Sequence, residues 1–297
     1  MKHLVQKLAN LECFDNIKQI CAIKSGLSAH SFKVQTQQRL YFAKYIGEND
    51  NSKVEVQCNL VAAIHGLSAK VIYTNNEWLI CDFIQGSELE HASICLESKL
   101  RIALSLMVKF HHLEIDLPPL NIYQAIINLL NPLYYRTAQI EQLTNIAQQI
   151  SSSIEVQPNY VCHGDVNFSN VLLSNNANII DVDNHNTAGY LVDFECACKA
   201  DVEFDLAMLL AINNPDKAYH RAVFHIYEEY ASEYNNVKIN HDLVMRYLGF
   251  SHLINALWFY NEFKKNNDET SFKRAHKQFI LFDSLAIFND KLSEQMR

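Results

Sequence analysis

The sequence predicts an α+β fold in which a small strand-rich region comes first and a large helical region follows. Two observations support this order. Short apolar segments rich in Phe, Tyr and Val alternate with polar turns before Gly86, which is typical of paired strands. After Gly86 the apolar residues recur at helical spacing, and from residue 202 this pattern continues almost to the end. We expect a first lobe with an antiparallel sheet over residues 1–85, a connection near 82–87 and a mainly helical second lobe over 88–297.

The first lobe is predicted to contain four strands and one helix. The strands are placed at 32–36, 40–46, 70–73 and 78–84. Between the two pairs, Ser52 stands three residues before Glu55, which is a capping-box pattern at the start of a helix. The apolar residues that follow share one helical face, which predicts the buried side of that helix: Val56, Leu60, Ala63, Ile64 and Leu67.

The second lobe is predicted to be helical except around one acidic segment. Helical spacing covers 96–113 and a region near 121–149, which Pro118 and Pro119 separate. The acidic segment is flanked by three short predicted strands at 170–173, 178–182 and 190–194. The boundaries of all these elements are expected to hold to within a few residues.

The composition restricts the class of protein. The chain has 297 residues, of which 49% are hydrophobic, enough to bury one large or two medium cores. A formal net charge of -8 disfavours a general nucleic-acid binder and is compatible with a cationic small-molecule partner. The eight Cys lack zinc-type spacing and indicate free thiols in a reducing cytoplasm. The first residues do not resemble a signal peptide, and no apolar run is long enough to cross a membrane.

The most informative motif runs from His163 to Asn170 and reads His-Gly-Asp-Val-Asn-Phe-Ser-Asn. Asp165 could accept the proton of a substrate hydroxyl or orient that hydroxyl. Asn170 and Asp193, which lies in Leu-Val-Asp-Phe-Glu, offer the oxygen ligands that Mg²⁺ prefers. Catalytic loops of protein kinases use an Asp, an Asn and a second Asp in the same way, so the motif indicates phosphoryl transfer. His163 is expected to pack and hydrogen-bond beneath the loop.

Residues of the first lobe could complete a nucleotide site. Lys44 lies in a predicted strand and could reach the phosphates, and Glu55 on the next helix could hold it in place, although a helix cap also explains Glu55. Ser25-Gly26-Leu27-Ser28 precedes the first strand pair, and its backbone amides and hydroxyl groups, that of Ser28 included, could cover phosphates.

These motifs together resemble the aminoglycoside phosphotransferase and choline kinase superfamily. The resemblance spans nearly the whole chain and includes Phe32-Lys33-Val34, the strand ending in Lys44, and Asp201 to Ala207. It implies a protein-kinase-like two-lobed fold, ATP, Mg²⁺ and a small acceptor with a hydroxyl group. It also implies a hinge at Cys81 to Gly86, with the adenine base against Asp82, Phe83 and Ile84.

Within that superfamily, Asp193-Phe194-Glu195 followed by Asp205-Leu206-Ala207 is most similar to the choline, ethanolamine and thiamine kinases. Choline and thiamine carry a permanent positive charge, which aromatic rings and carboxylates can bind. The candidate acceptor residues are Glu195, Asp201, Trp258 and Tyr260. Aromatic residues at this spacing more often belong to the core than to a ligand cage, and Asp201 could equally be a solvated residue. Asp205 is expected to be a cap or a loop anchor.

The chain departs from the family pattern at two places. The phosphate loop holds a single glycine, Gly26. The interval from Asn170 to Asp193 is long, at 193 − 170 = 23 positions, and it contains Asp181, which imitates the metal-binding motif. We prefer Asp193 because its step to Asp205, 205 − 193 = 12 positions, fits the family, and we expect the extra residues at 175–190 to form a hairpin.

Two other functions remain open at this point. An aminoglycoside or other antibiotic phosphotransferase would use the same motifs on a different acceptor. A non-enzymatic nucleotide-binding pseudokinase is disfavoured because Asp165, Asn170 and Asp193 are all present. A protein kinase is disfavoured because the chain lacks Ala-Pro-Glu and because Glu195 replaces the Gly of the usual Asp-Phe-Gly.

Overall fold

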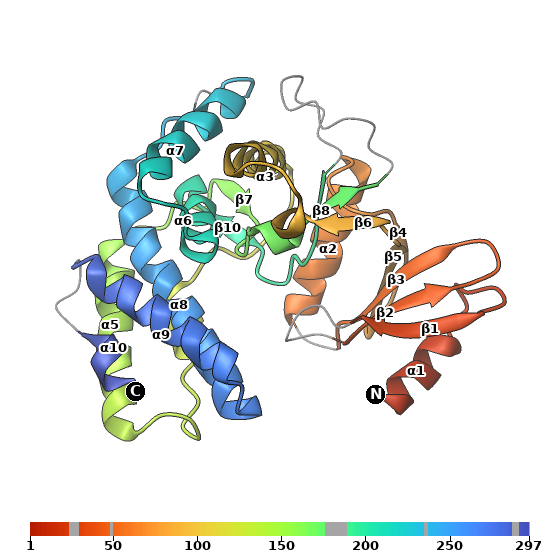
Figure 1. Cartoon of the computed structure of the whole chain (residues 1–297), viewed down its shortest axis with the longest axis horizontal. Coiled ribbons are helices and arrows are strands. Elements are labelled where there is room, and N and C mark those ends of the chain that lie inside the picture. The colour runs from red at the N-terminus through yellow and green to blue at the C-terminus, as the bar shows by residue number, and fades with distance from the viewer. Residues whose placement is uncertain (24–29, 48–49, 176–188, 235–236, 287–290, 297) are drawn as a thin grey trace. The chain divides into compact units, whose positions relative to one another are not determined.

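The computed structural model describes residues 1–23, 30–47, 50–175, 189–234, 237–286 and 291–296. They form two compact units, one made of residues 1–116 and 168–197 and the other of 117–167 and 198–297. The predicted α+β class is confirmed, with a small antiparallel sheet in the N-terminal part and a helical C-terminal part (Figure 1). The two compact units group segments that are distant in the sequence, so they do not test the predicted lobe boundary near 85, which stays a prediction.

The first unit is built on a five-stranded sheet in the order β1-β2-β3-β5-β4, in which every neighbouring pair is antiparallel. The strands are β1 (Gln19–Ile23), β2 (His30–Gln35), β3 (Leu40–Tyr45), β4 (Val71–Thr74) and β5 (Trp78–Asp82). Four of them match the predicted strands to within two residues at each end. The sequence analysis missed β1, a five-residue edge strand in which no residue is buried.

The two faces of this sheet differ in character. One face carries the buried residues Phe32, Val34, Tyr41, Ala43, Trp78 and Ile80, which pack with Leu8 of α1 (Lys2–Ala9). Because side chains alternate along a strand, Lys33 and Lys44 lie on the opposite face. The sheet therefore has one apolar side and one side that carries charge.

Helix α2 (Asp50–Ile64) differs from its prediction in two respects. The helix includes Asp50, so Ser52 lies inside it and is not the residue that caps it. The predicted buried face is also wrong, because Leu60 is 42% and Ile64 81% exposed. The buried side is partly polar and consists of Ser52, Glu55, Cys58, Asn59 and Ala62. One of these polar side chains, Glu55, is buried against the charged Lys44 of the sheet.

The rest of the first unit contains α3 (Leu96–His111) and a three-stranded antiparallel sheet in the order β6-β8-β9. Its strands are β6 (Gly86–Glu88), β8 (Val171–Ser174) and β9 (Gly189–Leu191). Two short 3₁₀ helices, η1 (Leu89–His91) and η2 (Phe168–Asn170), accompany them. Gly86 is required where β6 meets β8, because a Cβ atom there would lie 1.8 Å from the carbonyl oxygen of Leu173. The predicted strand at 178–182 lies outside the described residues.

The second unit is mainly helical, as predicted from residue 202 onward. Its helices are α4 (Ile122–Ile127), α5 (Thr137–Ser153), α6 (Val202–Asn213), α7 (Ala218–Ala231), α8 (His241–Asn266), α9 (Glu269–Ser284) and α10 (Leu292–Gln295). The predicted helical region near 121–149 is two helices, and two short paired strands, β7 (Tyr160–Cys162) and β10 (Cys198–Ala200), were missed. Three-residue strands leave too short a pattern to detect.

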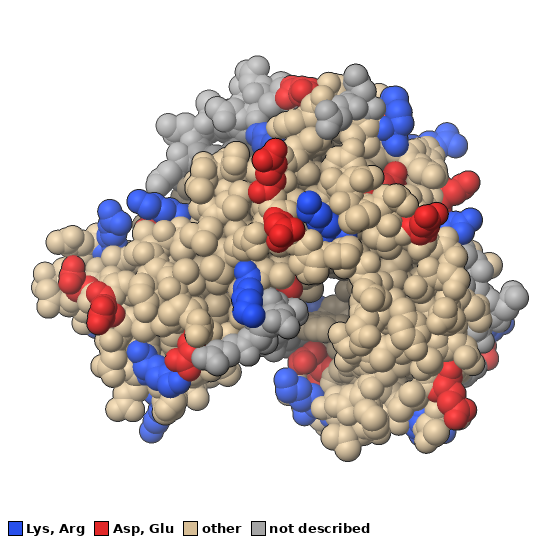
Figure 2. All heavy atoms as spheres, turned by 180° about the vertical axis from the view of Figure 1, so that it is seen from behind, with Lys and Arg blue, Asp and Glu red and all other residues tan. Residues whose placement is uncertain are grey.

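The described surface carries charges of both signs (Figure 2), and the cysteines agree with the sequence analysis. Figure 2 shows Lys and Arg interspersed with Asp and Glu over the described part of one face, without segregation by sign. All eight Cys are free thiols, four of them buried. No helix within the described ranges combines the length and the apolar character that crossing a bilayer requires.

Candidate active site

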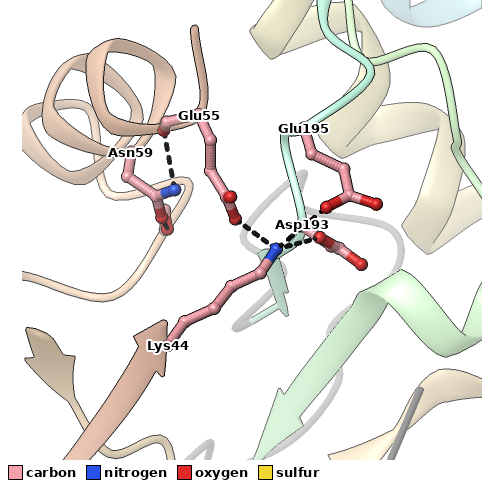
Figure 3. Close-up of polar contacts among 6 residues, drawn as sticks. Lys44, Glu55, Asn59, Asp193 and Glu195 are labelled. Atoms are coloured by element: carbon pink, nitrogen blue, oxygen red, sulfur yellow. Dashed lines mark hydrogen bonds and ion pairs between the residues drawn. The ribbon is translucent and has the colours of Figure 1, made fainter. Parts of the chain in front are cut away.

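A buried lysine joins three carboxylates in the first unit (Figure 3). The Lys44 Nζ atom lies 2.6 Å from Glu55 Oε1, 2.6 Å from Asp193 Oδ1 and 3.4 Å from Glu195 Oε2. Only 7% of the Lys44 side chain and 4% of the Glu55 side chain are exposed, compared with 37% for Asp193 and 36% for Glu195. The lysine is therefore anchored on its buried side by Glu55 and faces two carboxylates that solvent can reach.

The buried side of this cluster is held by helix α2. Lys44 is brought to this face by its register in β3, where it pairs with Ser31 on one side and Leu79 on the other. Glu55 lies on the buried side of the helix, and the Asn59 side chain donates to its backbone carbonyl at 2.9 Å. Ser68 in turn donates to Asn59 at 3.2 Å, which fixes the amide. The sequence analysis missed Asn59, which follows Glu55 by one helical turn.

The solvent side of the cluster is held by an unusual backbone. Asp193 has a φ of 68°, in the left-handed region that non-glycine residues seldom occupy. The next residue, Phe194, is fully buried and stacks on Phe110 with ring centroids 5.1 Å apart. The buried ring fixes the chain at this point, and the left-handed turn before it directs the Asp193 carboxylate to Lys44. Such strain at a charged residue is typical of functional sites.

The charges of the cluster are strongly coupled. Burial alone would lower the pKa of Lys44, but the Asp193 and Glu55 carboxylates outweigh this effect and raise it above the usual value. Burial raises the pKa of Glu55 to about 7, and the Lys44 ammonium limits that rise. Lys44 is therefore a permanent cation at neutral pH, suited to binding anionic oxygen atoms.

The two predicted metal ligands lie on adjacent segments. The backbone carbonyl of Asn170 accepts a hydrogen bond from Val192 N at 3.1 Å, directly before Asp193, and β8 and β9 pair at Val171 and Leu191. An amide oxygen and a partly exposed carboxylate form the hard oxygen set that Mg²⁺ requires. The residues present therefore fit a magnesium ion. Asp181, the alternative ligand, lies outside the described residues.

The loop that carries Asp165 belongs to the second unit and is fixed by a buried carboxylate. Asp205 is fully buried, and its two oxygens accept from the backbone amides of His163 and Gly164, each at 2.8 Å. Gly164 has a φ of 78°, so a glycine suits the turn. The predicted role of Asp205 as a loop anchor is confirmed by these bonds.

The other groups of this loop orient Asp165 itself. His163 is fully buried, and its Nδ1 atom accepts from Asp165 N at 3.3 Å, which confirms the expected place of the ring beneath the loop. Asn167 donates from its side chain to Asp165 Oδ1 at 3.1 Å. The sequence analysis missed Asn167, although an amide two residues after a candidate base is a usable signal. The Asp165 carboxylate is thus held by its own loop.

Two more carboxylates at the start of α6 have similar structural partners. Asp201 Oδ2 accepts from the Tyr247 hydroxyl at 2.7 Å and from Gln157 N at 3.1 Å. Glu203, which the sequence analysis did not single out, accepts from Asn240 N at 2.9 Å, where α8 begins. Asp201 is only 8% exposed, so these bonds weigh against its predicted role in binding an acceptor.

The predicted aromatic residues differ from each other in exposure. Tyr260 is 5% exposed and packs on Tyr135, with ring centroids 5.3 Å apart, and Lys264 lies 5.0 Å from its ring. Trp258 is half-buried and contacts Phe259 edge-on at 5.0 Å. A cationic ligand would meet a competing ammonium at Tyr260, so Trp258 is the better placed of the two.

The predicted hinge residues lie at the end of β5 and directly after it. Asp82 N donates to Lys70 O at 2.9 Å and Phe83 N donates to Leu40 O at 3.1 Å, so both amides are used within the sheet. A nucleotide base would have to use other polar groups there, such as those of Ile84. Ser28 and the rest of the predicted phosphate loop lie outside the described residues.

Comparison with known proteins identifies the family. The Phosphotransferase enzyme family matches the chain over residues 19–237. This chain belongs to that family. The match includes the Lys44 strand, the His163–Asn170 motif, Asp193 and Asp205, and so agrees with the predicted resemblance. A search of curated protein sequences finds no match.

Solved structures of phosphotransferases share the fold over nearly the whole chain. The choline kinase LicA from Streptococcus pneumoniae is 16% identical, with a TM-score of 0.70 over 97% of this chain and 99% of that one. An ethanolamine kinase from Plasmodium vivax is 15% identical, with a TM-score of 0.67 over 95% and 88%. A spectinomycin phosphotransferase, in complex with ADP and spectinomycin, is 12% identical, with a TM-score of 0.58 over 99% and 96%. At these identities the likeness establishes the fold.

Proposed function

We propose that this chain is an ATP- and magnesium-dependent kinase that transfers the γ-phosphate to a hydroxyl group of a small cationic molecule such as choline, ethanolamine or thiamine. The observation that carries the proposal is the Lys44 ammonium, 2.6 Å from both Glu55 and Asp193. Binding of a nucleoside triphosphate requires a cation that can contact the phosphate oxygens. Here Glu55 fixes that cation on its buried side, and the candidate metal ligand Asp193 lies beside it. Membership of the phosphotransferase family supports the same reaction class.

Each proposed residue has a distinct part in the reaction. Lys44 binds phosphate oxygens, and Asn170 and Asp193 would hold a magnesium ion, which when bound neutralises charge on the phosphates. Asp165 accepts the proton as the acceptor oxygen forms its bond to the γ-phosphorus and the bond to the β-phosphate oxygen breaks. The products are a phosphate monoester and ADP. The hydrogen bonds from Asn167 and from the Asp165 amide to His163 keep the base oriented.

The cationic acceptor is supported by charge and by residue type. Glu195 of the first unit and Trp258 of the second are each partly exposed, and a carboxylate and an aromatic face are each suited to an ammonium group. The chain as a whole is also acidic, at -8. We further propose that the enzyme acts in the cytoplasm, where ATP is present and eight free thiols stay reduced.

A substrate panel tests this proposal. Purified protein with ATP and Mg²⁺ is offered choline, ethanolamine, thiamine and several aminoglycosides, and ADP release is followed by a coupled assay. We expect turnover with one of the cationic alcohols, its loss in EDTA, and its loss in Asp165→Asn. Turnover of aminoglycosides alone would move the chain to antibiotic phosphorylation, and ATP binding without any turnover would indicate a pseudokinase.

A further inference from the structure

Two buried cysteines lie opposite each other in the short sheet of the second unit. Cys162 of β7 and Cys198 of β10 are direct partners in the register of this antiparallel pair (Figure 1). Both are free thiols, with 0% of Cys162 and 7% of Cys198 exposed. Directly opposite residues put their side chains on the same face of a sheet, with Cα atoms about 4.5–5.5 Å apart. A disulfide spans about 4.4–6.8 Å between Cα atoms, so the backbone already has the spacing that a bond between the two sulfurs needs.

The two thiols differ in their access to solvent. Cys162 is fully buried, and its Sγ atom donates to Asp201 O at 3.4 Å. Burial and, to a smaller extent, the Asp205 carboxylate raise the pKa of this thiol well above its ordinary value, so it stays protonated and is a poor nucleophile alone. Cys198 raises that pKa as well, as a close neighbour does. Because Cys198 keeps some exposure, a small oxidant reaches its sulfur first, and Cys162 lies beside the product.

A bond between these sulfurs would act on the loop that carries Asp165. Cys162 directly precedes His163, and the amides of His163 and Gly164 donate to Asp205 at 2.8 Å each. The Cβ atoms of opposite residues lie about 4.5–5.5 Å apart, whereas those of a disulfide lie about 3.8 Å apart. Bond formation therefore draws Cys162 toward β10 by about 1 Å. A displacement of about 1 Å in a catalytic loop can lower turnover by up to about 100-fold.

We propose that Cys162 and Cys198 form a reversible disulfide in the presence of a hydroperoxide, and that this bond slows phosphoryl transfer by displacing the loop of Asp165. The Cys198 sulfur, as its thiolate, attacks the peroxide, the O–O bond breaks, and water or an alcohol leaves with the proton that the thiol released. The Cys162 sulfur then attacks the sulfenic acid, and the S–O bond breaks as water departs with the Cys162 proton. Two thiols are oxidised and one peroxide is reduced.

The bond is expected to be reversible because it holds the strands closer together than the sheet does. Strained disulfides are the more easily reduced ones, so a thiol reductant restores both cysteines. The effect on turnover rests on the proposed function, whereas the disulfide itself does not. The two parts are therefore measured separately.

Mass spectrometry of the full chain tests the bond. The protein is treated with hydrogen peroxide, the remaining thiols are alkylated, and the chain is cleaved at acidic residues without reduction. Asp165, Asp193 and Glu195 lie between the two cysteines, so only a disulfide keeps them joined after cleavage. We expect the joined peptides in the wild type and in Cys196→Ser, the matched control, which removes the exposed thiol nearest to Cys198 in the sequence. Cys198→Ser should give no joined peptides.

Turnover and hydrogen exchange test the effect on the loop. Oxidation should lower kcat by about tenfold in the wild type and in Cys196→Ser, and dithiothreitol should restore it. Cys198→Ser should keep its activity in peroxide. The amides of His163 and Gly164 should exchange faster in the oxidised chain, a readout that does not depend on turnover.

The outcomes separate this inference from the proposed function. Failure to form the joined peptides, or an oxidised chain whose kcat or amide exchange is unchanged, would overturn the inference. Absence of turnover in the reduced wild type with every acceptor would overturn the proposed function alone. The joined peptides and the amide exchange of the His163 loop would then still decide whether the disulfide forms and displaces that loop.

Discussion

The carboxylates around Lys44 and those at the start of α6 resemble each other in sequence and differ in their surroundings. Asp193 and Glu195 are more than one-third exposed, and both contact the Lys44 ammonium. Asp201 and Asp205 are buried, and their partners are backbone amides and a tyrosine hydroxyl. The first pair can exchange its partner for a ligand, whereas the second pair holds the chain together. Burial and partner type, more than residue type, separate a reactive acid from a structural one.

The strongest test of this contrast is the loss of charge at Asp193. Asp193→Asn keeps the shape of the side chain and tolerates the left-handed backbone at 68°. We expect kcat to fall by about 1,000-fold, equivalent to about 4 kcal/mol of barrier, because the proposed metal loses its charged ligand. The free energy of unfolding should change by less than about 1 kcal/mol, since the side chain is partly exposed and Lys44 keeps Glu55.

The control for this variant is Asp181→Ala, which removes the competing acid of the sequence motif. Turnover close to the wild type is expected there. A comparable loss of kcat in Asp181→Ala, with activity retained in Asp193→Asn, would show that the metal ligand had been misassigned.

At Asp205, in contrast to Asp193, we expect a substitution to lower the free energy of unfolding. Asp205→Asn leaves an amide group facing one of the two backbone N–H donors, so the free energy of unfolding should fall by about 2–3 kcal/mol. Urea unfolding followed by circular dichroism measures this change. Glu203→Gln is the matched control on the same helix: it can still accept from Asn240 N through its carbonyl oxygen, so a loss of about 1 kcal/mol is expected. Equal losses in the two variants would show that the paired amides are not the cause.

Whether the sequence could separate the reactive acids from the structural ones depends on how far apart along the chain the contacting residues lie. Alternation and turns predicted four strands of the sheet, and the motif spacing singled out Lys44, Asp165 and Asp193. The buried face of α2 could not be found from hydrophobicity, because the helix buries Glu55 and Asn59 and exposes Ile64. Glu55 is buried where it binds Lys44, and Asn59 is buried where it donates to the Glu55 carbonyl.

The structural roles at α6 were harder to predict for a related reason. Asp201 contacts Tyr247 and Gln157, which lie far away along the chain, so nothing in its local sequence distinguishes it from a ligand-binding acid. The left-handed backbone at Asp193 was equally hidden, because it follows from the buried stacking of Phe194 on Phe110.

The interior of the helical region allows a smaller test, based on pH. His252 on α8 is 4% exposed, its Nδ1 atom lies 2.6 Å from Gln278 Oε1, and the Gln278 side chain donates to Ala211 O at 3.0 Å. Burial lowers the pKa of His252 from 6.5 to about 4, although the hydrogen bond to Gln278 opposes this shift. The neutral ring is therefore built into the packing of three helices.

A depressed folded-state pKa means that the unfolded chain binds the proton first. The stability contributed by neutral His252 is thus complete above 6.5 and is lost as the pH falls toward 4. Relative to His252→Gln, the wild type should lose about 2 kcal/mol of unfolding free energy between about pH 7.5 and about pH 5. Chemical unfolding of both proteins at the two pH values measures this difference, and other titrating groups, including Glu55, cancel because both proteins share them. A constant difference across that range would mean that His252 is protonated within the fold at little cost, and that the helical region tolerates a buried charge despite the burial of the ring.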